Sequence, residues 1–79
     1  MMRNLLTRTP RHSIPETKAI EIAKSECRVR GWPWLEPVRV TYRWGRWRIQ
    51  TNHGLRGLNV QIVLHGQTGS IISATLRPR

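Results

Sequence analysis

Few side chains in this 79-residue chain have the types and spacing that acid–base, nucleophilic or metal chemistry requires. The three histidines, His12, His53 and His65, do not have the spacing of metal ligands, and the only cysteine, Cys27, has no C-x-x-C or C-x-x-H partner nearby. The four glutamates do not form an acid–base pair. We therefore expect no catalytic residue, no metal and no cofactor, and we interpret Cys27 as a small core residue.

Binding of anions is the chemistry that the sequence favours. The stretch 43–48 reads RWGRWR, and the chain has 12 Arg and 2 Lys against 4 Glu and no Asp, which gives a formal net charge of +10. Arginine pairs with phosphate and carboxylate groups, and indole stacks on nucleobases. This charge favours a nucleic acid, an acidic protein or a membrane surface as partner and does not choose among them.

The first part of the chain predicts a basic arm followed by one helix. Residues 1–12 contain three arginines and no sustained hydrophobic period, so we expect a flexible arm. Residues 13–16, SIPE, fit the S-x-x-E capping box, in which the serine hydroxyl accepts a hydrogen bond from the glutamate amide. Apolar residues recur at helical spacing from Ala19 to Cys27, and Gly31 is a typical helix stop. The prediction is an amphipathic helix over about residues 14–30.

After the helix the pattern changes from helical to extended. The connector 32–37, WPWLEP, contains two prolines and cannot continue a helix, and its two tryptophans are expected to cover the end of the core. From residue 38 the apolar period is two, which predicts strands at about 38–44, 47–52 and 58–65, and the GQTG turn leads into a fourth strand at about 70–76. We expect one α+β domain over residues 13–79, with the N-terminal helix packed on one face of a four-stranded antiparallel meander sheet.

The alternation also divides the strand residues between two faces. The apolar face is expected beneath the helix and contains Val38, Val40, Tyr42, Trp44, Trp47, Ile49, Thr51, Leu58, Val60, Ile62 and Leu64. The other face is expected to be open and carries Thr41, Gln50, Asn59, Gln61 and Val63 together with the charged positions. The candidate partner-binding residues on it are Arg39, Arg43, Arg46, Arg48 and His65.

The RWGRWR stretch fits the tip of the first hairpin. With Gly45-Arg46 as a two-residue type II′ turn, Trp44 would face Trp47 on the apolar side. Arg43 would then lie opposite Arg48, and such a pair of like charges suggests a bound anion. In this arrangement the aromatic rings and the arginines point to opposite sides of the sheet, which weakens the case for nucleic-acid binding.

Three motifs resemble the PepSY domain, a small α+β module of protease propeptides and standalone bacterial proteins. They are SIPETKAIEIAK, similar to that family's helix opening, WRIQT, similar to one of its strands, and VQIVLHGQTGSII, similar to its last hairpin. The resemblance covers about residues 13–76, and His65 stands where the family often has Asp. It implies a non-catalytic binding or inhibitory module, such as an immunity or protease-regulating factor. The basic open face, and not the resemblance, favours an acidic protein as its partner.

Two alternatives to an acidic protein partner remain open. One is a small basic nucleic-acid-binding protein. The other is an orphan domain that forms homo-oligomers and whose arginine excess is compositional. No continuous apolar stretch long enough for a signal peptide or a membrane span is present, so we expect a cytoplasmic protein.

Overall fold

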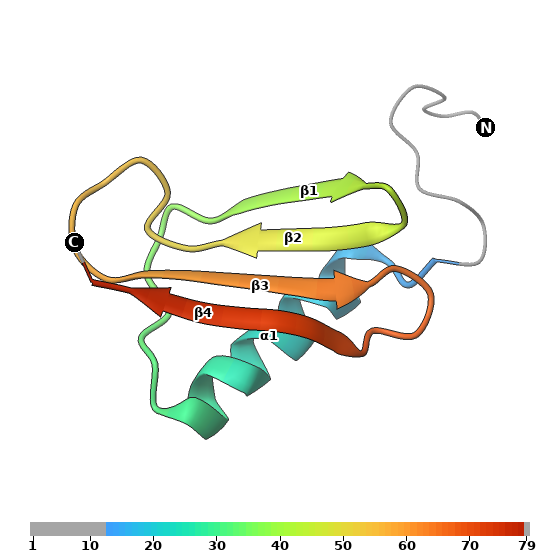
Figure 1. The fold of residues 1–79 in the computed structure, drawn as a ribbon, viewed down its shortest axis with the longest axis horizontal. Coiled ribbons are helices and arrows are strands. Elements are labelled where there is room, and N and C mark those ends of the chain that lie inside the picture. The colour runs from blue at the N-terminus through green and yellow to red at the C-terminus, as the bar shows by residue number, and fades with distance from the viewer. Residues whose placement is uncertain (1–12, 79) are drawn as a thin grey trace.

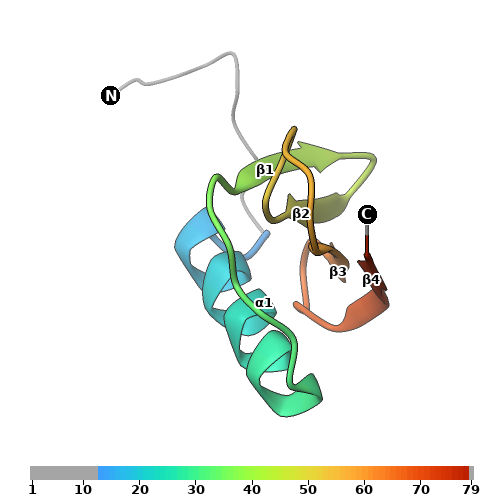
Figure 2. The same cartoon turned by 90° about the vertical axis from the view of Figure 1, so that its left-hand side faces the viewer.

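The computed structural model describes residues 13–78, and the predicted basic arm, residues 1–12, lies outside them. Helix α1 (Glu16–Arg30) precedes four strands, which are β1 (Arg39–Arg43), β2 (Arg46–Gln50), β3 (Asn59–His65) and β4 (Ile71–Arg77). Neighbouring strands pair antiparallel in the order β1-β2-β3-β4 (Figure 1). Helix α1 contacts β2 from one side of the sheet, and no helix or strand of residues 13–78 covers the opposite side (Figure 2). The predicted α+β architecture is confirmed.

The core lies between α1 and the middle of the sheet. Three small residues of α1, Ala19, Ala23 and Cys27, are buried and let the helix approach closely. They pack against five buried residues of the two central strands, namely Trp47, Ile49, Val60, Ile62 and Leu64. Period-two burial is therefore confirmed on β2, and it holds on β3 except at Val63, which is buried as well. Leu58, just before β3, is exposed.

The C-terminal end of α1 agrees with the sequence prediction, and the N-terminal end does not. Gly31 ends the helix in the left-handed conformation, with φ of 73°, and the N–H groups of Gly31 and Trp32 donate to the last-turn carbonyls of Arg28 and Cys27. This stop is confirmed. The capping box is wrong, because Pro15 is the N-cap and no side chain bonds the first turn. The Ser13 hydroxyl instead lies 2.9 Å from a tyrosine hydroxyl of β1.

The connector tryptophans cover the end of the core, as predicted. Trp32 and Trp34 are half-buried and pack against the core cluster. Basic side chains of α1 lie over both rings, with the Arg30 guanidinium 4.9 Å from the Trp32 centroid and Lys24 Nζ 5.7 Å from that of Trp34. The two indole rings thus contact the core and the basic side chains of α1, and these contacts leave them unable to stack on a ligand.

The first hairpin differs from the prediction by its turn and register. The turn residues are Trp44 and Gly45, and both have positive φ (55° and 75°), as the type I′ turn requires. Tyr42, not Trp44, therefore faces Trp47 across the strands, and Arg43 lies opposite Arg46 rather than opposite Arg48. Trp44 is 87% exposed, so its predicted place on the apolar face is wrong.

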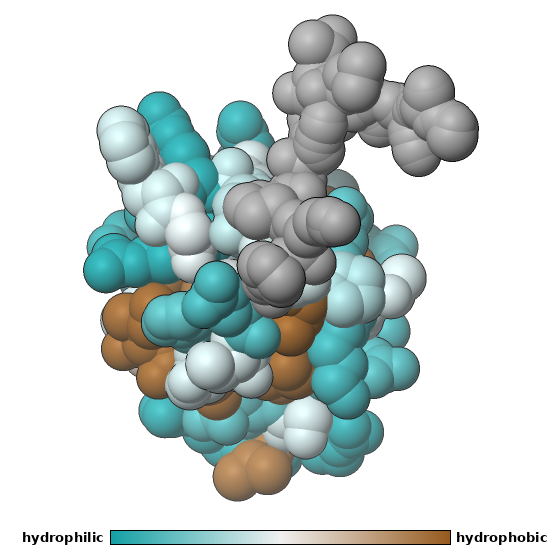
Figure 3. Space-filling model, turned by 90° about the vertical axis from the view of Figure 1, so that its right-hand side faces the viewer, coloured by the Kyte–Doolittle hydropathy of each residue, from teal (hydrophilic) through white to brown (hydrophobic). Residues whose placement is uncertain are grey.

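No helix among residues 13–78 is long and apolar enough to cross a membrane. Figure 3 looks onto the end of the molecule where the β1–β2 and β3–β4 turns lie, and most of the described surface there is hydrophilic. Some apolar atoms also reach that surface. Ile71 and Ile72, at the start of β4, are among the exposed apolar residues.

Candidate anion-binding face

The uncovered side of the sheet, which we call the basic face, carries the four arginines predicted as partner-binding residues. Its arginines on β1 and β2 are Arg39, Arg43, Arg46 and Arg48, and all four are exposed. The strand register places Arg39 in one row, Arg48 in the next, and Arg43 opposite Arg46 in the third. Rows on one face are two residues apart, about 6.8 Å, so the guanidinium groups are distributed over about 14 Å of the sheet.

Charge is separated between the two layers of the molecule. Residues 13–37, the helix and connector, contain four basic and four acidic side chains, whereas residues 38–78 contain six arginines and no acidic residue. Within the described residues the two ion pairs, Lys18–Glu21 and Arg30–Glu26, both lie on α1. In that part of the chain the arginines of the basic face therefore have no carboxylate partner, and their charges face solvent.

The arginines surround one shallow hollow. All four line it, together with Thr41 and Gln50 of the same face, and with Tyr42, Trp44 and Val63. Val63 is buried although it lies on the open side, because it sits among the side chains of the basic face opposite Arg48. Trp44, whose side chain is exposed, also lines the hollow from the turn. The structure thus places one exposed tryptophan beside the arginines, which the predicted register excluded.

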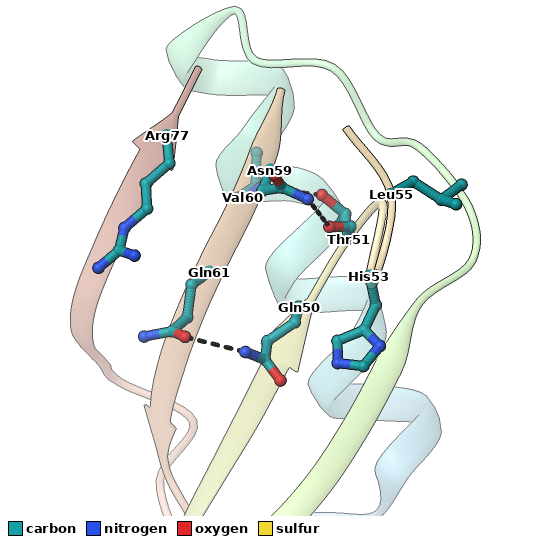
Figure 4. Close-up of a pocket in the computed structure, with 9 residues that line it drawn as sticks. Gln50, Thr51, His53, Leu55, Asn59, Val60, Gln61 and Arg77 are labelled. Carbon is teal, nitrogen blue, oxygen red and sulfur yellow. Dashed lines mark hydrogen bonds between the residues drawn. The ribbon is translucent and has the colours of Figure 1, made fainter. Parts of the chain in front are cut away.

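A second hollow continues the basic face toward the β2–β3 loop (Figure 4). Gln50 belongs to both hollows, and its Nε2 donates to Gln61 Oε1 across β2 and β3 at 3.1 Å. His53 and Arg77 flank this amide pair on opposite sides (Figure 4). His53 Nε2 also lies 3.5 Å from Arg39 Nη1. The sequence pattern did not single out His53 or Arg77, because neither belongs to the two strands whose alternation defined the arginine set.

Asparagines hold the loop that carries His53. Asn52 has a φ of 51°, a left-handed conformation that asparagine tolerates, and its Nδ2 donates to the Arg56 and Leu58 carbonyls at 3.0 and 3.2 Å. Asn59 Nδ2 donates to the Thr51 and Asn52 carbonyls, while its Oδ1 is buried without a hydrogen-bond partner. Asn59 lines the second hollow, on the side of the sheet where it was predicted, and its amide nitrogen also holds the loop.

His65 lies at the end of β3, exposed and opposite Arg46. Its Nδ1 accepts a hydrogen bond from the Gln67 N–H at 3.2 Å. His65, Arg46 and Trp44 line a third hollow at the turn end of the sheet. The five residues predicted as a partner-binding set thus occupy one side of the sheet, with His65 at its margin.

Cys27 does not belong to a chemical site in the described part of the chain. It is buried in the core, where burial raises the pKa of its thiol and the neighbouring Glu26 carboxylate raises this pKa further. Among residues 13–78 no group of three or more histidine, cysteine or acidic side chains is placed to hold a metal ion.

Comparison with known proteins assigns no family and no function to this chain. No family model matches the chain, and no curated protein or solved structure matches it. The resemblance to the PepSY domain stays a prediction that rests on the three sequence motifs.

Proposed function

We propose that this protein is a non-catalytic binding module that holds an acidic macromolecule against its basic face. The observation that carries the proposal is the separation of charge, with six arginines and no acidic residue over residues 38–78. Arginine is suited to this role because its planar guanidinium pairs with carboxylate and phosphate groups through parallel hydrogen bonds.

The arrangement of the arginines favours a ligand over a purely structural role. Arg43 and Arg46 lie directly opposite each other next to the turn. Like charges in that position destabilise a hairpin, by up to about 1 kcal/mol, whereas an anion bound between them would remove the repulsion. An acidic protein and a nucleic acid both supply such anions.

Two triple variants with equal net charge test the proposal. In the first, Arg43, Arg46 and Arg48 are replaced by glutamine, which removes three charges from the basic face. In the control, Lys18, Arg28 and Arg56 are replaced by glutamine, which removes three exposed charges from α1 and the β2–β3 loop. Circular dichroism and thermal unfolding establish that both variants fold.

Binding to immobilised polyglutamate and to an immobilised single-stranded oligonucleotide is then measured at low salt. We expect the basic-face variant to lose most binding to at least one polymer and the control to retain it, because only the first set of charges lies together on one surface. Equal weakening in both variants would mean that only net charge matters, and the proposal would fail.

A further inference from the structure

We propose that the acidic macromolecule is a single-stranded nucleic acid, with Trp44 stacked on a base and the arginines of the basic face on its phosphates. This inference rests on the proposed function and names its ligand. It starts from Trp44, because packing within the protein does not explain the backbone conformation or the exposure of this residue.

Trp44 occupies a backbone position that suits other residues better. Its φ of 55° lies in the left-handed region, where a bulky side chain is uncommon, and type I′ turns favour asparagine, aspartate or glycine there. Packing does not compensate, because the side chain is 87% exposed. Residues kept in unfavourable backbone conformations cluster at ligand sites. A large aromatic ring presented to solvent in this way is explained by a ligand with a flat apolar surface.

The surroundings of Trp44 supply the second requirement, positive charge. Trp44 lines two hollows at once, the one formed by the four arginines and the one that contains His65. Trp44 directly follows Arg43 in the sequence and lines both hollows together with Arg46. A base stacked on the indole would therefore bring its own phosphates toward these two guanidinium groups.

The remaining arginines extend this contact along the sheet. Arg48 and Arg39 lie one and two rows further from the turn, at steps of about 6.8 Å, a spacing that an extended sugar–phosphate backbone can follow. At the far end, Gln50 Nε2 donates to Gln61 Oε1 (Figure 4), and within residues 13–78 the Gln50 Oε1 and Gln61 Nε2 atoms have no other side-chain partner. Such amides form hydrogen bonds with base edges. The line of residues from Trp44 along the arginines to Gln50 and Gln61, which we call the track, thus has a stacking end and a polar end.

A single strand fits this track better than the other anions. Bases in a duplex are stacked on each other, so Trp44 reaches a base face only when the strand is unpaired. An acidic peptide matches the arginines equally well but gains nothing specific from an exposed indole. Stacking is available to every base, so we expect little sequence preference.

The experiment uses the full chain and four ligands of equal formal charge: oligo-dT, oligo-U, an abasic oligonucleotide and polyglutamate. Binding of oligo-dT is expected to quench tryptophan fluorescence and to exceed binding of the abasic strand by about 5- to 150-fold, the range of one stacked base. Each phosphate contact contributes about 0.7 to the slope of log K against log salt for single strands. Replacing Arg43, Arg46 and Arg48 by glutamine should therefore lower that slope by about 2.

Trp44→Asn removes the indole ring and keeps the turn, because Asn-Gly is the preferred type I′ turn sequence. We expect this variant to bind oligo-dT about 5- to 150-fold more weakly and to bind the abasic strand like the wild type. Trp44→Phe keeps a stacking surface and should fall between wild type and Trp44→Asn. Comparison of oligo-dT with oligo-U shows whether DNA, RNA or both occupy the site.

Three results would overturn the inference. If Trp44→Asn binds oligo-dT like the wild type, the ring does not stack. If polyglutamate binds at least as strongly as oligo-dT, the basic face is a surface for an acidic protein. Each of these two results leaves the proposed function standing. If none of the four ligands binds at low salt, both the inference and the proposed function fail.

Discussion

Tyr42 on β1 faces Trp47 on β2, and their rings meet edge to face with centroids 4.9 Å apart. Each ring has a polar tip that reaches the segment ahead of α1. The Tyr42 hydroxyl lies 2.9 Å from Ser13 Oγ, and Trp47 Nε1 donates to the Ile14 carbonyl at 3.1 Å. The pair therefore fastens the start of the helix layer to the first hairpin.

The first prediction concerns the two tryptophans of the RWGRWR stretch. Trp47→Phe keeps an aromatic ring but leaves the Ile14 carbonyl without its donor, so we expect a loss of about 1–3 kcal/mol in unfolding free energy. Trp44→Phe is the matched control and should change it by less than about 0.5 kcal/mol, because that side chain is exposed. Urea unfolding monitored by circular dichroism measures both. Equal effects would contradict the assigned register.

The second prediction concerns the close approach of the two turns at one end of the sheet. A Cβ added at Gly66 would lie 2.6 Å from the Gly45 carbonyl oxygen and 2.7 Å from the Tyr42 hydroxyl. Gly66→Ala should therefore lower the unfolding free energy by about 1–3 kcal/mol, as overpacking does. Gln67→Ala, at the next and exposed position, should stay near the wild-type value in the same urea titration.

The third prediction is that Trp44→Asn stabilises the protein. Asparagine accepts the left-handed conformation that tryptophan adopts with difficulty, so the unfolding free energy should rise by about 1 kcal/mol. The melting temperature of the variant relative to wild type measures the gain. A lower melting temperature would show that the exposed indole contributes to folding, contrary to the argument that it serves a ligand.

The fourth prediction separates stability from binding at the charged end of the hairpin. Arg43→Glu replaces a repulsive cross-strand pair with Arg46 by an attractive one, which should add about 0.2–1 kcal/mol to the unfolding free energy while weakening polyanion binding. Arg39→Glu introduces the same charge opposite Gln50. It should weaken binding without the gain in stability. Unfolding and binding assays on both variants check this difference.

The fifth prediction concerns Cys27. Burial and the Glu26 carboxylate raise its pKa above the ordinary value of 9.0, so the folded state holds the thiol proton more strongly than the unfolded chain. Its stabilising contribution is complete below about pH 9 and declines as the pH rises through the folded-state pKa. A thiol reagent should label Cys27 quickly in urea and slowly without it. Equal labelling rates would show that the core opens easily.

The sequence was sufficient to predict the elements that hydrophobic periodicity controls. Helical spacing predicted α1, period two predicted the first three strands and the buried sides of β2 and β3, and the GQTG turn predicted β4. Because the same period fixes which side chains point away from the core, the arginines of the basic face were also predictable as a group. Their separation from all acidic residues follows from the chain order, since no acidic residue comes after Glu36.

The predictions of the first turn and of the helix cap were wrong because both features depend on tertiary contacts. In RWGRWR one glycine is compatible with either of two turns, type II′ with Gly45 first or type I′ with Gly45 second. The observed register brings Tyr42 rather than Trp44 against Trp47. Ser13 fitted a local capping motif, but its hydroxyl pairs with Tyr42, 29 residues away. Neither choice can be read from neighbours in the sequence.

The separation of charge has a further consequence for how the molecule approaches a partner. A balanced layer, residues 13–37, backs a layer that carries six positive charges, so the described part of the chain has an electric dipole moment directed from the helix toward the sheet. The field of a polyanion exerts a torque on this dipole moment before any contact forms, and the torque turns the basic face toward the ligand. Productive encounters should thus be more frequent than random orientation allows, and this advantage should shrink as added salt shortens the Debye length.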